Sequence, residues 1–471
     1  MTKTSAINRI HELLDDNSFV EVGAYITARS TDYNMQSQET PADGVVTGYG
    51  TINGALVYVY SQDASVMGGS IGEMHAKKIE KLYSMAMKMG APIVALVDCA
   101  GFRLQESMDA LDGFGKLYVC QAMASGVIPQ IQAVFGNCGG GMAVASEMAD
   151  FTFMEQEAKM FVNAPFVIAE NDADNSSAEY QAKETGNVCA TGSEKEIFTE
   201  IRNLVSILPA NNEDDMSYSE CEDDLNRICT DIENCAGDTS IALSMISDDS
   251  FYMEMKKDYA PEMVTAFIRL NGATIGAVAN RSEVYDAEGK KVETFDGSIS
   301  ARGARKAADF VKFCDAFDIP VLTLTNATGF MATLCSEKMM AKSVGELVAA
   351  FADATVPKVN VIIGKAYGTA YVAMNSKSIG ADLVYAWDNA EIGMMDASLA
   401  AKIMYADADA AELNEKAAQY RELQNGVASA AARGYVDTVI SPADTRKYVI
   451  GAFEMLFTKR EDRPSKKHGT I

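Results

Sequence analysis

The chain has 471 residues, of which 48% are hydrophobic, so it is long enough to bury two cores of ordinary domain size. Its 66 Asp and Glu against 40 Lys and Arg give a formal net charge of −26 at pH 7, which argues against an extended surface for nucleic acids or anionic membranes. No apolar run reaches a membrane span of roughly 18 residues, no signal peptide is expected, and the nine cysteines form no C-x-x-C pair. We therefore expect a soluble, cytoplasmic protein with reduced thiols.

In chain order, the first predicted elements are two strands joined at an Asn-Gly turn within VVTGYGTINGALVYVYSQD, residues 45–63. An amphipathic helix, KKIEKLYSMAMKMG, follows at residues 77–90, and then a buried strand, IVALV, that ends at a glycine turn. After a further helical stretch, Pro129 introduces a second buried strand, QIQAVF, which ends in glycines. This order predicts a strand–helix–strand–helix unit with parallel, fully buried strands.

The same order recurs in the second half of the chain. A second hairpin pattern, at residues 265–280, precedes DIPVLTLTNATGF (318–330) and ATVPKVNVIIGKAYGT (354–369), which match GAPIVALVDCAGF (90–102) and GVIPQIQAVFGNCGGG (126–141). The paired positions all differ by 228: Pro92 and Pro320, Asp98 and Asn326, Gly101 and Gly329, Pro129 and Pro357, Gly136 and Gly364, and Gly140 and Gly368. Such a constant offset indicates a repeat of a whole α/β domain.

An acidic segment, residues 209–240, separates the two copies and is short of large apolar residues. We expect it to be an exposed linker and place the domain boundary within it, which gives domains 1–235 and 236–471. The basic tail, residues 458–471, is expected to lie on the surface, where docking of a partner is the less favoured interpretation.

Each copy places small residues where a buried strand ends and a helix begins. Backbone N–H groups at the start of a helix have no intrahelical acceptor, and glycine lets a ligand approach them closely. The sequences GNCGGGMAVASEMAD and GKAYGTAYVAMNSKSIGAD therefore each predict an oxyanion hole. Tight packing is the alternative explanation for one such turn, but its presence in both copies favours the functional one.

Three other patterns suggest sites that we reject. GGSIG (68–72) matches the hydrolase pattern around Ser70, but the only later histidines are His75 and His468, so we expect Ser70 to cap a helix or to contact ligand. AMKM (86–89) looks like a biotinylation site at Lys88, yet it ends an amphipathic helix, and we expect a surface lysine. The cysteines of the acidic segment, Cys221, Cys229 and Cys235, are irregularly spaced, and we assign no metal site.

Several long strings resemble a known family nearly end to end: RIHELLDDNSFVEVGA (9–24), ADGVVTGYGTINGALVYVYSQDASVMGGSIGEMHAKKIEK (42–81), ASGVIPQIQAVFGNCGGGMA (124–143), ATVPKVNVIIGKAYGTAY (354–371) and AARGYVDTVISPADTR (431–446). The family comprises the carboxyltransferase β-subunits of propionyl-CoA and related biotin-dependent acyl-CoA carboxylases. It includes the α-subunits of sodium-pumping methylmalonyl-CoA and glutaconyl-CoA decarboxylases. The resemblance implies an α/β fold of two crotonase-like domains of the ClpP/crotonase superfamily. It also implies an active site across a dimer, commonly within a hexamer.

The resemblance also implies roles for individual residues. The N-terminal domain would bind the acyl-CoA, with the amides of Gly139 and Gly140 on the thioester oxygen, and the C-terminal domain would bind biotin, with the amides of Thr369 and Ala370 on its oxygen. A coenzyme A thioester would be the substrate, and biotin would arrive on a separate protein, with its ureido nitrogen as the base. The remaining candidates for substrate contact are Gly69, Ser70, Gly141, Gly368 and Val372, with Lys77, Lys78 and Lys365 as cations for the CoA phosphates.

This chain departs from the usual family pattern near the substrate. The usual A-Y-G-G-A-Y followed by Asp becomes AYGTAYV, with Thr369 and Val372, while D-x-P-G-F becomes NATGF and C-A-G-G becomes CGGG. Val372 in place of a carboxylate makes the acyl end of the pocket less polar. The resemblance therefore does not identify which acyl-CoA is the substrate.

The leading hypothesis is an enzyme, the carboxyltransferase component of a soluble acyl-CoA carboxylase. Its expected partners are biotin carboxylase and biotin carboxyl carrier subunits, with further copies of itself in a dimer or hexamer. The first alternative is the same component of a sodium-pumping decarboxylase, which works in reverse with a membrane subunit. A non-catalytic scaffold is the second, and a ClpP-like peptidase is disfavoured because no triad can be drawn.

Overall fold

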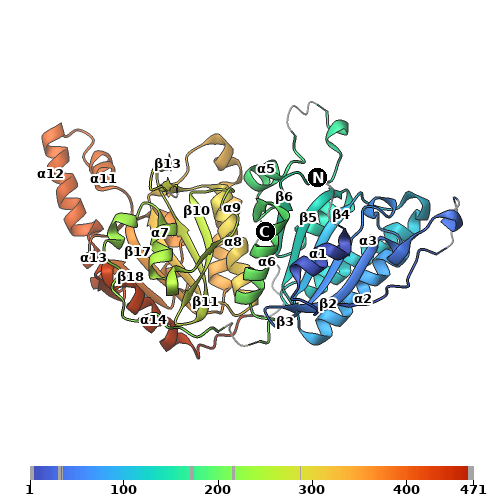
Figure 1. The fold of residues 1–471 in the computed structure, drawn as a ribbon. Helices are drawn as coiled ribbons and strands as arrows, with labels where there is room; N and C mark the ends of the chain where they lie inside the picture. The colour runs from blue at the N-terminus through green and yellow to red at the C-terminus, as the bar shows by residue number, and fades with distance from the viewer. Residues whose placement is uncertain are drawn as a thin grey trace. The chain divides into compact units, whose positions relative to one another are not determined.

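The computed structural model describes residues 5–29, 33, 35–169, 174–214, 218–286 and 288–464. The chain divides into two compact units, Met1–Ser217 and Tyr218–Ile471 (Figure 1). The division falls within the acidic segment that we expected to hold the boundary, but before residue 235. His468 and the rest of the tail from residue 465 lie outside the described residues.

The part of the acidic segment that follows residue 217 is packed onto the second unit, which differs from the exposed linker we expected. Cys229 and Ile232 are buried, and the Cys229 amide donates to the Ala443 carbonyl at 2.9 Å. The Arg227 guanidinium donates to the backbone carbonyls of Met245 and Ser247 at 2.9 and 3.0 Å. These contacts explain why residues 218–235 belong to the second unit.

The first unit is built on an eight-stranded sheet of order β1-β2-β3-β4-β5-β6-β8, with β7 paired to β5 beyond the end of β6. Its strands are β1 (Val20–Glu21), β2 (Val45–Ile52), β3 (Ala55–Gln62), β4 (Ile93–Cys99), β5 (Gln130–Gly139), β6 (Phe151–Glu155), β7 (Lys159–Phe161) and β8 (Ala190–Gly192). Its helices are α1 (Ala6–Leu13), α2 (Glu73–Met89), α3 (Met108–Ala124), α4 (Gly141–Glu147), α5 (Ala178–Tyr180) and α6 (Glu194–Ile207).

Alternation along the buried strands gives this sheet two covered faces. The antiparallel hairpin β2–β3 turns at Asn53 and Gly54, both with positive φ, and β3 to β6 then run parallel. Residues of one parity in β4, such as Ile93 and Val97, pack against α2 and α3. Helices α1 and α6 contact the strands from the other face. The predicted strand–helix–strand–helix unit is therefore observed.

Helix α2 has the amphipathic pattern predicted for it. Ile79, Leu82 and Ala86 are buried on one side, whereas Lys88 is exposed in the last turn, and Gly90 ends the helix with φ 61°. Lys88 is therefore a helix-surface residue, as expected.

The second unit repeats this topology in an eight-stranded sheet of order β9-β10-β11-β15-β17-β18-β20, with β19 paired to β17. Its strands are β9 (Tyr252–Glu254), β10 (Met263–Leu270), β11 (Ala273–Asn280), β15 (Val321–Ala327), β17 (Lys358–Tyr367), β18 (Leu383–Trp387), β19 (Glu391–Gly393) and β20 (Thr438–Ile440); outside this sheet, β12 (Glu283–Tyr285) pairs with β13 (Lys291–Thr294), and β14 (Ser298–Ile299) with β16 (Gly329–Phe330). Its helices are α7 (Thr239–Ile246), α8 (Ala301–Ala316), α9 (Leu334–Asp353), α10 (Gly368–Ala373), α11 (Ala397–Met404), α12 (Ala410–Tyr420), α13 (Val427–Ala432) and α14 (Thr445–Leu456).

The two units also agree in local detail. Paired positions differ by 218 in the hairpins, as for Asn53 and Asn271, and by 228 from Gly69 and Gly297 onward. The second unit therefore carries ten additional residues after β11, where the hairpin β12–β13 lies.

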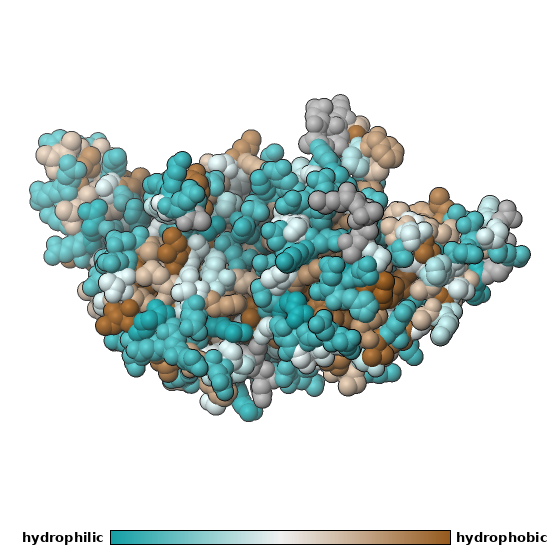
Figure 2. Space-filling model, in the orientation of Figure 1, coloured by the Kyte–Doolittle hydropathy of each residue, from teal (hydrophilic) through white to brown (hydrophobic). Residues whose placement is uncertain are grey.

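On the surface, hydrophilic residues dominate the visible face of each unit, with smaller hydrophobic areas between them (Figure 2). This agrees with the net charge of −26. Over the residues that the structure describes, no helix combines the length and the apolar character needed to cross a bilayer.

Candidate active site

Three segments of the first unit meet at the carboxyl ends of its parallel strands. They are residues 68–71, which we call the strap, the end of β4, and the turn between β5 and α4. The Ala100 amide donates to the Gly68 carbonyl at 3.0 Å, and the Ile71 amide to the Gly101 carbonyl at 2.9 Å. A Cβ atom on Gly139 would lie 3.0 Å from the Ala100 carbonyl oxygen, so the end of β5 is in close contact with the end of β4.

Glycines allow these close approaches. A Cβ atom on Gly69 would lie 2.0 Å from the Asp98 carbonyl oxygen, and one on Gly141 would lie 2.8 Å from the Tyr118 hydroxyl. Gly140, with φ 60° and ψ −123°, adopts a backbone conformation that side chains disfavour, yet nothing lies within 4 Å of the position its Cβ would take. The turn is therefore open beside Gly140, where a ligand can reach the backbone.

The amides available at this turn differ from those we expected. The Gly140 N–H donates to the Phe161 carbonyl at 2.9 Å, and Gly139 lies inside β5 opposite Phe161. Helix α4 begins at Gly141, so the N–H groups of Gly141 and Met142 have no acceptor within the helix. The prediction that the Gly140 amide faces the substrate is therefore wrong, because β7 already uses that amide.

The turn between β17 and α10 in the second unit has a glycine with nearly the same φ, although α10 begins at that glycine and α4 begins one residue after its counterpart. Gly368 has φ 61°, Thr369 is exposed, and Ala370 is buried within α10. The 228-residue offset pairs Thr369 with Gly141 and Ala370 with Met142. The repeat itself thus pointed to Gly141 and Met142, and Met142 is a residue that the sequence reasoning missed.

Ser70 and His75 do not form a hydrolase pair. The Ser70 hydroxyl donates to the Met67 carbonyl at 2.7 Å, and Gly72 rather than Ser70 is the N-cap of α2. The fully buried His75 ring lies 3.0 Å (Nδ1) from the Asp43 carbonyl oxygen and 3.2 Å (Nε2) from the Gln62 amide nitrogen. Because a carbonyl only accepts, Nδ1 carries the proton and Nε2 accepts from Gln62. Burial lowers the pKa of His75 to about 3, so the ring is neutral at pH 7.

A buried charged network fixes the strap, and sequence reasoning missed it. The fully buried Arg103 guanidinium contacts Asp43 Oδ1 at 2.6 Å, Glu106 Oε1 at 2.7 Å and the Ser70 carbonyl oxygen at 3.1 Å. Glu106 Oε2 in turn accepts the Glu73 amide at the start of α2. These contacts hold the strap against the end of β4. The only sequence signal was an arginine two residues after the glycine turn of the first repeat.

The structure separates the three candidate phosphate-binding lysines. Lys78 is buried, and its ammonium group donates to the Ala42 and Val45 carbonyls, which contradicts the expected contact with phosphate. Burial also lowers the pKa of Lys78 to about 8. Lys77 is exposed but pairs with Glu73 at 2.7 Å, whereas Lys365 is exposed beside the second turn.

The repeat-related Lys306 makes the same kind of contacts as Lys78. Its buried ammonium group donates to the Tyr259 and Met263 carbonyls at 2.9 and 2.7 Å. Lys78 and Lys306 thus have matching structural roles in the two units.

The second turn is braced by a polar cluster at its own end of the sheet. The Tyr367 hydroxyl donates to the Glu391 carboxylate, whose other oxygen lies 3.5 Å from Arg421 Nε. Burial raises the pKa of Tyr367 above its ordinary value. Val372 is half-buried in α10, the helix that begins at this turn.

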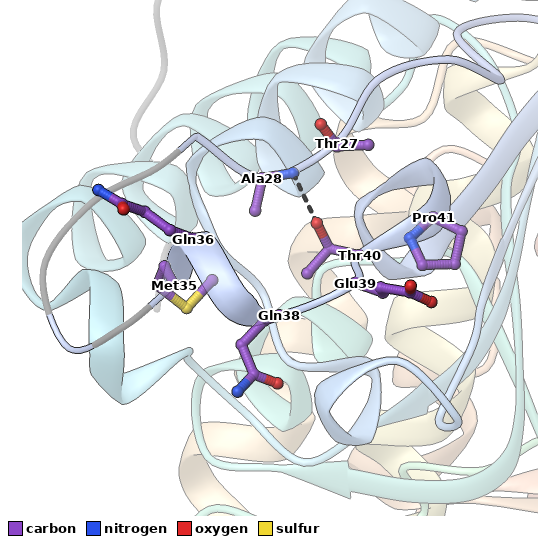
Figure 3. A pocket seen from close by; sticks show the side chains of 8 residues that line it. All are labelled: Thr27, Ala28, Met35, Gln36, Gln38, Glu39, Thr40 and Pro41. Carbon is purple, nitrogen blue, oxygen red and sulfur yellow. Dashed lines mark hydrogen bonds between the residues drawn. The ribbon is translucent and has the colours of Figure 1, made fainter.

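A separate hollow of about 460 Å³ lies away from these turns in the first unit. It is lined by Thr27, Ala28, Met35, Gln36, Gln38, Glu39, Thr40 and Pro41, with the Ala28 amide donating to the Thr40 hydroxyl at 3.0 Å (Figure 3). These eight residues include one carboxylate and no cation, so the hollow does not suit a phosphate-bearing ligand.

Two topologically equivalent α/β units, each with a glycine turn after a central parallel strand, define a duplicated crotonase-like protein. The whole chain, residues 1–471, matches the family model described as the carboxyl transferase domain. It is 40% identical to the propionyl-CoA carboxylase beta chain of Roseobacter denitrificans, over 100% of this chain and 94% of that protein. It is 38% identical to the methylmalonyl-CoA decarboxylase subunit alpha of Propionigenium modestum, over 100% of this chain and 93% of that protein. This chain belongs to the carboxyl transferase family.

A solved structure agrees with this assignment. The transcarboxylase 12S crystal structure with hydrolyzed methylmalonyl-coenzyme A bound has a TM-score of 0.93 and 38% identity, and the match covers 99% of this chain and 92% of that one. The expected fold class, two crotonase-like domains, is confirmed. The expected class of enzyme, a carboxyltransferase of the biotin-dependent acyl-CoA type, is confirmed as well.

Proposed function

We propose that this chain transfers a carboxyl group between carboxybiotin, carried on a separate protein, and the α-carbon of an acyl-CoA. The observation that carries this proposal is the pair of matched glycine turns. Gly140 and Gly368 adopt φ 60° and 61° at the same place in two units of equal topology. Carboxyl transfer creates negative charge on two oxygens, the thioester enolate and the biotin ureido oxygen, and two sets of backbone donors meet that need.

The two turns fit their ligands through backbone groups. When its carrier brings it to the site, biotin supplies the carboxyl group and a ureido nitrogen as base. In the first unit, the acyl-CoA side, the N–H groups of Gly141 and Met142 would donate to the thioester oxygen. In the second unit, the biotin side, those of Thr369 and Ala370 would donate to the biotin oxygen, with Gly368 giving close access. Each donor favours the charged form over the ground state, which lowers the barrier.

Side chains near the turns would set the substrate. Gly69 and Ser70 belong to the strap beside the first turn, where they would line the acyl-CoA site. The exposed Lys365 is the cation that we retain for a CoA phosphate. The half-buried Val372 would contact the acyl group and favour an apolar one.

For the direction of transfer, we propose carboxylation with biotin carboxylase and biotin carboxyl carrier subunits. We place the complex in the cytoplasm, where free thiols such as the buried Cys99, Cys138 and Cys314 stay reduced. A homo-oligomer is proposed because the 12S structure is described as a hexamer assembly.

The reverse reaction is the second candidate, supported by the decarboxylase relative at 38% identity. Co-purification with an ATP-dependent biotin carboxylase would support carboxylation. Co-purification with a multi-span membrane subunit would support decarboxylation.

Decarboxylation of methylmalonyl-CoA and malonyl-CoA in the presence of free biotin tests the site. Thr369→Pro deletes one proposed donor at a helix start, where proline is tolerated, and should lower kcat by about 10²–10³-fold. Thr369→Ala keeps the N–H and is the matched control, expected within a few-fold of wild type. An unaffected Thr369→Pro enzyme would refute the role of this amide. A wild-type protein without activity on any malonyl-type CoA ester would instead support the non-catalytic scaffold.

A further inference from the structure

The ends of the two central strands share an unusual register change. Between Val97 and Cys99, strand β4 advances two residues while its partner advances four, from Val134 to Cys138. In the second unit β15 advances from Thr325 to Ala327 while β17 advances from Ile362 to Ala366. Each bulge lies directly before a glycine turn, so its geometry determines where the turn begins.

One side chain occupies the centre of each bulge. In the first unit Asp98 Oδ1 accepts the Asn137 amide at 3.1 Å, and a Cβ atom on Gly136 would lie only 2.1 Å from that oxygen. A backbone N–H that the bulge removes from the strand ladder is thereby satisfied by a side chain.

The second unit reproduces this contact at the 228-residue offset. Asn326 Oδ1 accepts the Lys365 amide at 2.9 Å, and a Cβ atom on Gly364 would lie 2.4 Å from that oxygen. The shared element is therefore a single side-chain oxygen at the same place.

The other ends of the two side chains differ. Asp98 Oδ2 lies 3.9 Å from the buried Arg9 guanidinium, whereas Asn326 Nδ2 donates to the Ala236 carbonyl at 3.1 Å. One position is compensated by a positive charge and the other by a carbonyl acceptor. The Oδ1 contact is present in both units, directly before the glycine turn that the units share.

We propose that Asp98 and Asn326 are positioning residues, whose Oδ1 atoms hold the bulges so that the amides after Gly140 and Gly368 point to the reacting oxygens. This inference rests on the proposed function for its kinetic consequence, but its structural consequence stands by itself. The segment after each bulge is held on its other side by a short strand, β7 or β19. Loss of the Oδ1 contact would free one side of the turn and move the donors, and misplacement by about 1 Å can cost about 100-fold in rate.

Four substitutions distinguish an effect of the Oδ1 contact on kcat from an effect of lower stability. Asp98→Ala removes the Oδ1 acceptor and should lower kcat by roughly 10- to 100-fold with a smaller change in KM. Asp98→Asn keeps the Oδ1 acceptor, as the second unit does with Asn326, and should restore kcat to within about threefold. Arg9→Met removes the charged neighbour and keeps the Oδ1 contact, so it should lower the melting temperature without a matching loss of kcat. The reciprocal variant Asn326→Ala should resemble Asp98→Ala in kcat.

Amide hydrogen exchange tests the structural part without reference to the reaction. Asp98→Ala should speed exchange at the Asn137 amide at least tenfold and leave the Lys365 amide unchanged, and Asn326→Ala should do the reverse. Unchanged exchange at the neighbouring amide in both alanine variants would overturn the proposal. So would equal kcat losses in Asp98→Ala and Asp98→Asn, or a kcat loss in Arg9→Met as large as in Asp98→Ala. If the wild-type chain transferred no carboxyl group, the proposed function would fail, while the exchange data would still decide the positioning role.

Discussion

Neutral His75 makes the stability of the first unit depend on pH. Its folded pKa of about 3 lies below the unfolded value of about 6.5, so the unfolded chain binds the proton more readily. Stability is therefore full above about pH 7 and falls as the pH drops through 6.5, by about 1.4 kcal/mol per pH unit. Between pH 7.5 and 5.0 this single ring accounts for about 2 kcal/mol of the free energy of unfolding.

The test compares wild type with His75→Gln, which cannot titrate. Unfolding in denaturant is measured at pH 7.5 and at pH 5.0, with hydrogen exchange in α2 as the probe. Between these two pH values the free energy of unfolding of the wild type should fall by about 2 kcal/mol more than that of the variant. His11→Gln, at an exposed site on α1, is the control for a histidine-to-glutamine substitution elsewhere in the first unit. The fluorescence of Trp387, the chain's single tryptophan, reports on the second unit and should not distinguish the variants. Equal pH dependence of wild type and His75→Gln in α2 would refute this reasoning.

Three further outcomes are expected. Gly141→Ala should lower kcat because its Cβ would lie 2.8 Å from the Tyr118 hydroxyl, and adding Tyr118→Phe should restore part of the loss in a double-mutant cycle; additive effects would contradict the contact. Lys306→Met should destabilise the second unit by about 3 kcal/mol, because two buried carbonyls lose their donor, and Trp387 fluorescence should detect this change in denaturant. Val372→Asp should lower kcat/KM for longer acyl-CoA esters more than for propionyl-CoA, so that the ratio of the two kcat/KM values falls about tenfold. An unchanged ratio would exclude contact between Val372 and the acyl group.

Most of the scaffold could be predicted because it depends on short-range patterns. The buried strands IVALV and VLTLT and the glycine turns appear where the apolar runs and the 228-residue offset placed them, and the hairpins appear where the Asn-Gly pairs placed them. Local sequence patterns gave wrong predictions where a residue distant in sequence determines the hydrogen-bond partner. The Gly140 amide is used by β7, a strand of three residues too short to show a periodicity.

Burial of charge was the other obstacle to prediction. Lys78 looks like a surface cation in an amphipathic helix, but its ammonium group is buried and donates to two carbonyls more than 30 residues away in the chain. The segment after residue 217 looks like a solvated linker, but Arg227 and the fully buried Arg446 anchor it to the second unit. Arg446 donates to the Asp224 carbonyl, 222 residues away in sequence, and no pattern along the chain encodes such a contact.

The ten extra residues after β11 have a practical consequence for labelling this protein. The first unit connects the equivalent strand β3 to the strap without them, so the fold does not need their length. The hairpin β12–β13 lies at this place, and its strand β13 is exposed throughout, with Val292 59% exposed. Chain length at this place can vary while the sheet stays the same, and exposed connections of this kind tolerate inserted sequence. An epitope or a fluorophore-binding peptide inserted at this hairpin would mark the second unit without disturbing either core.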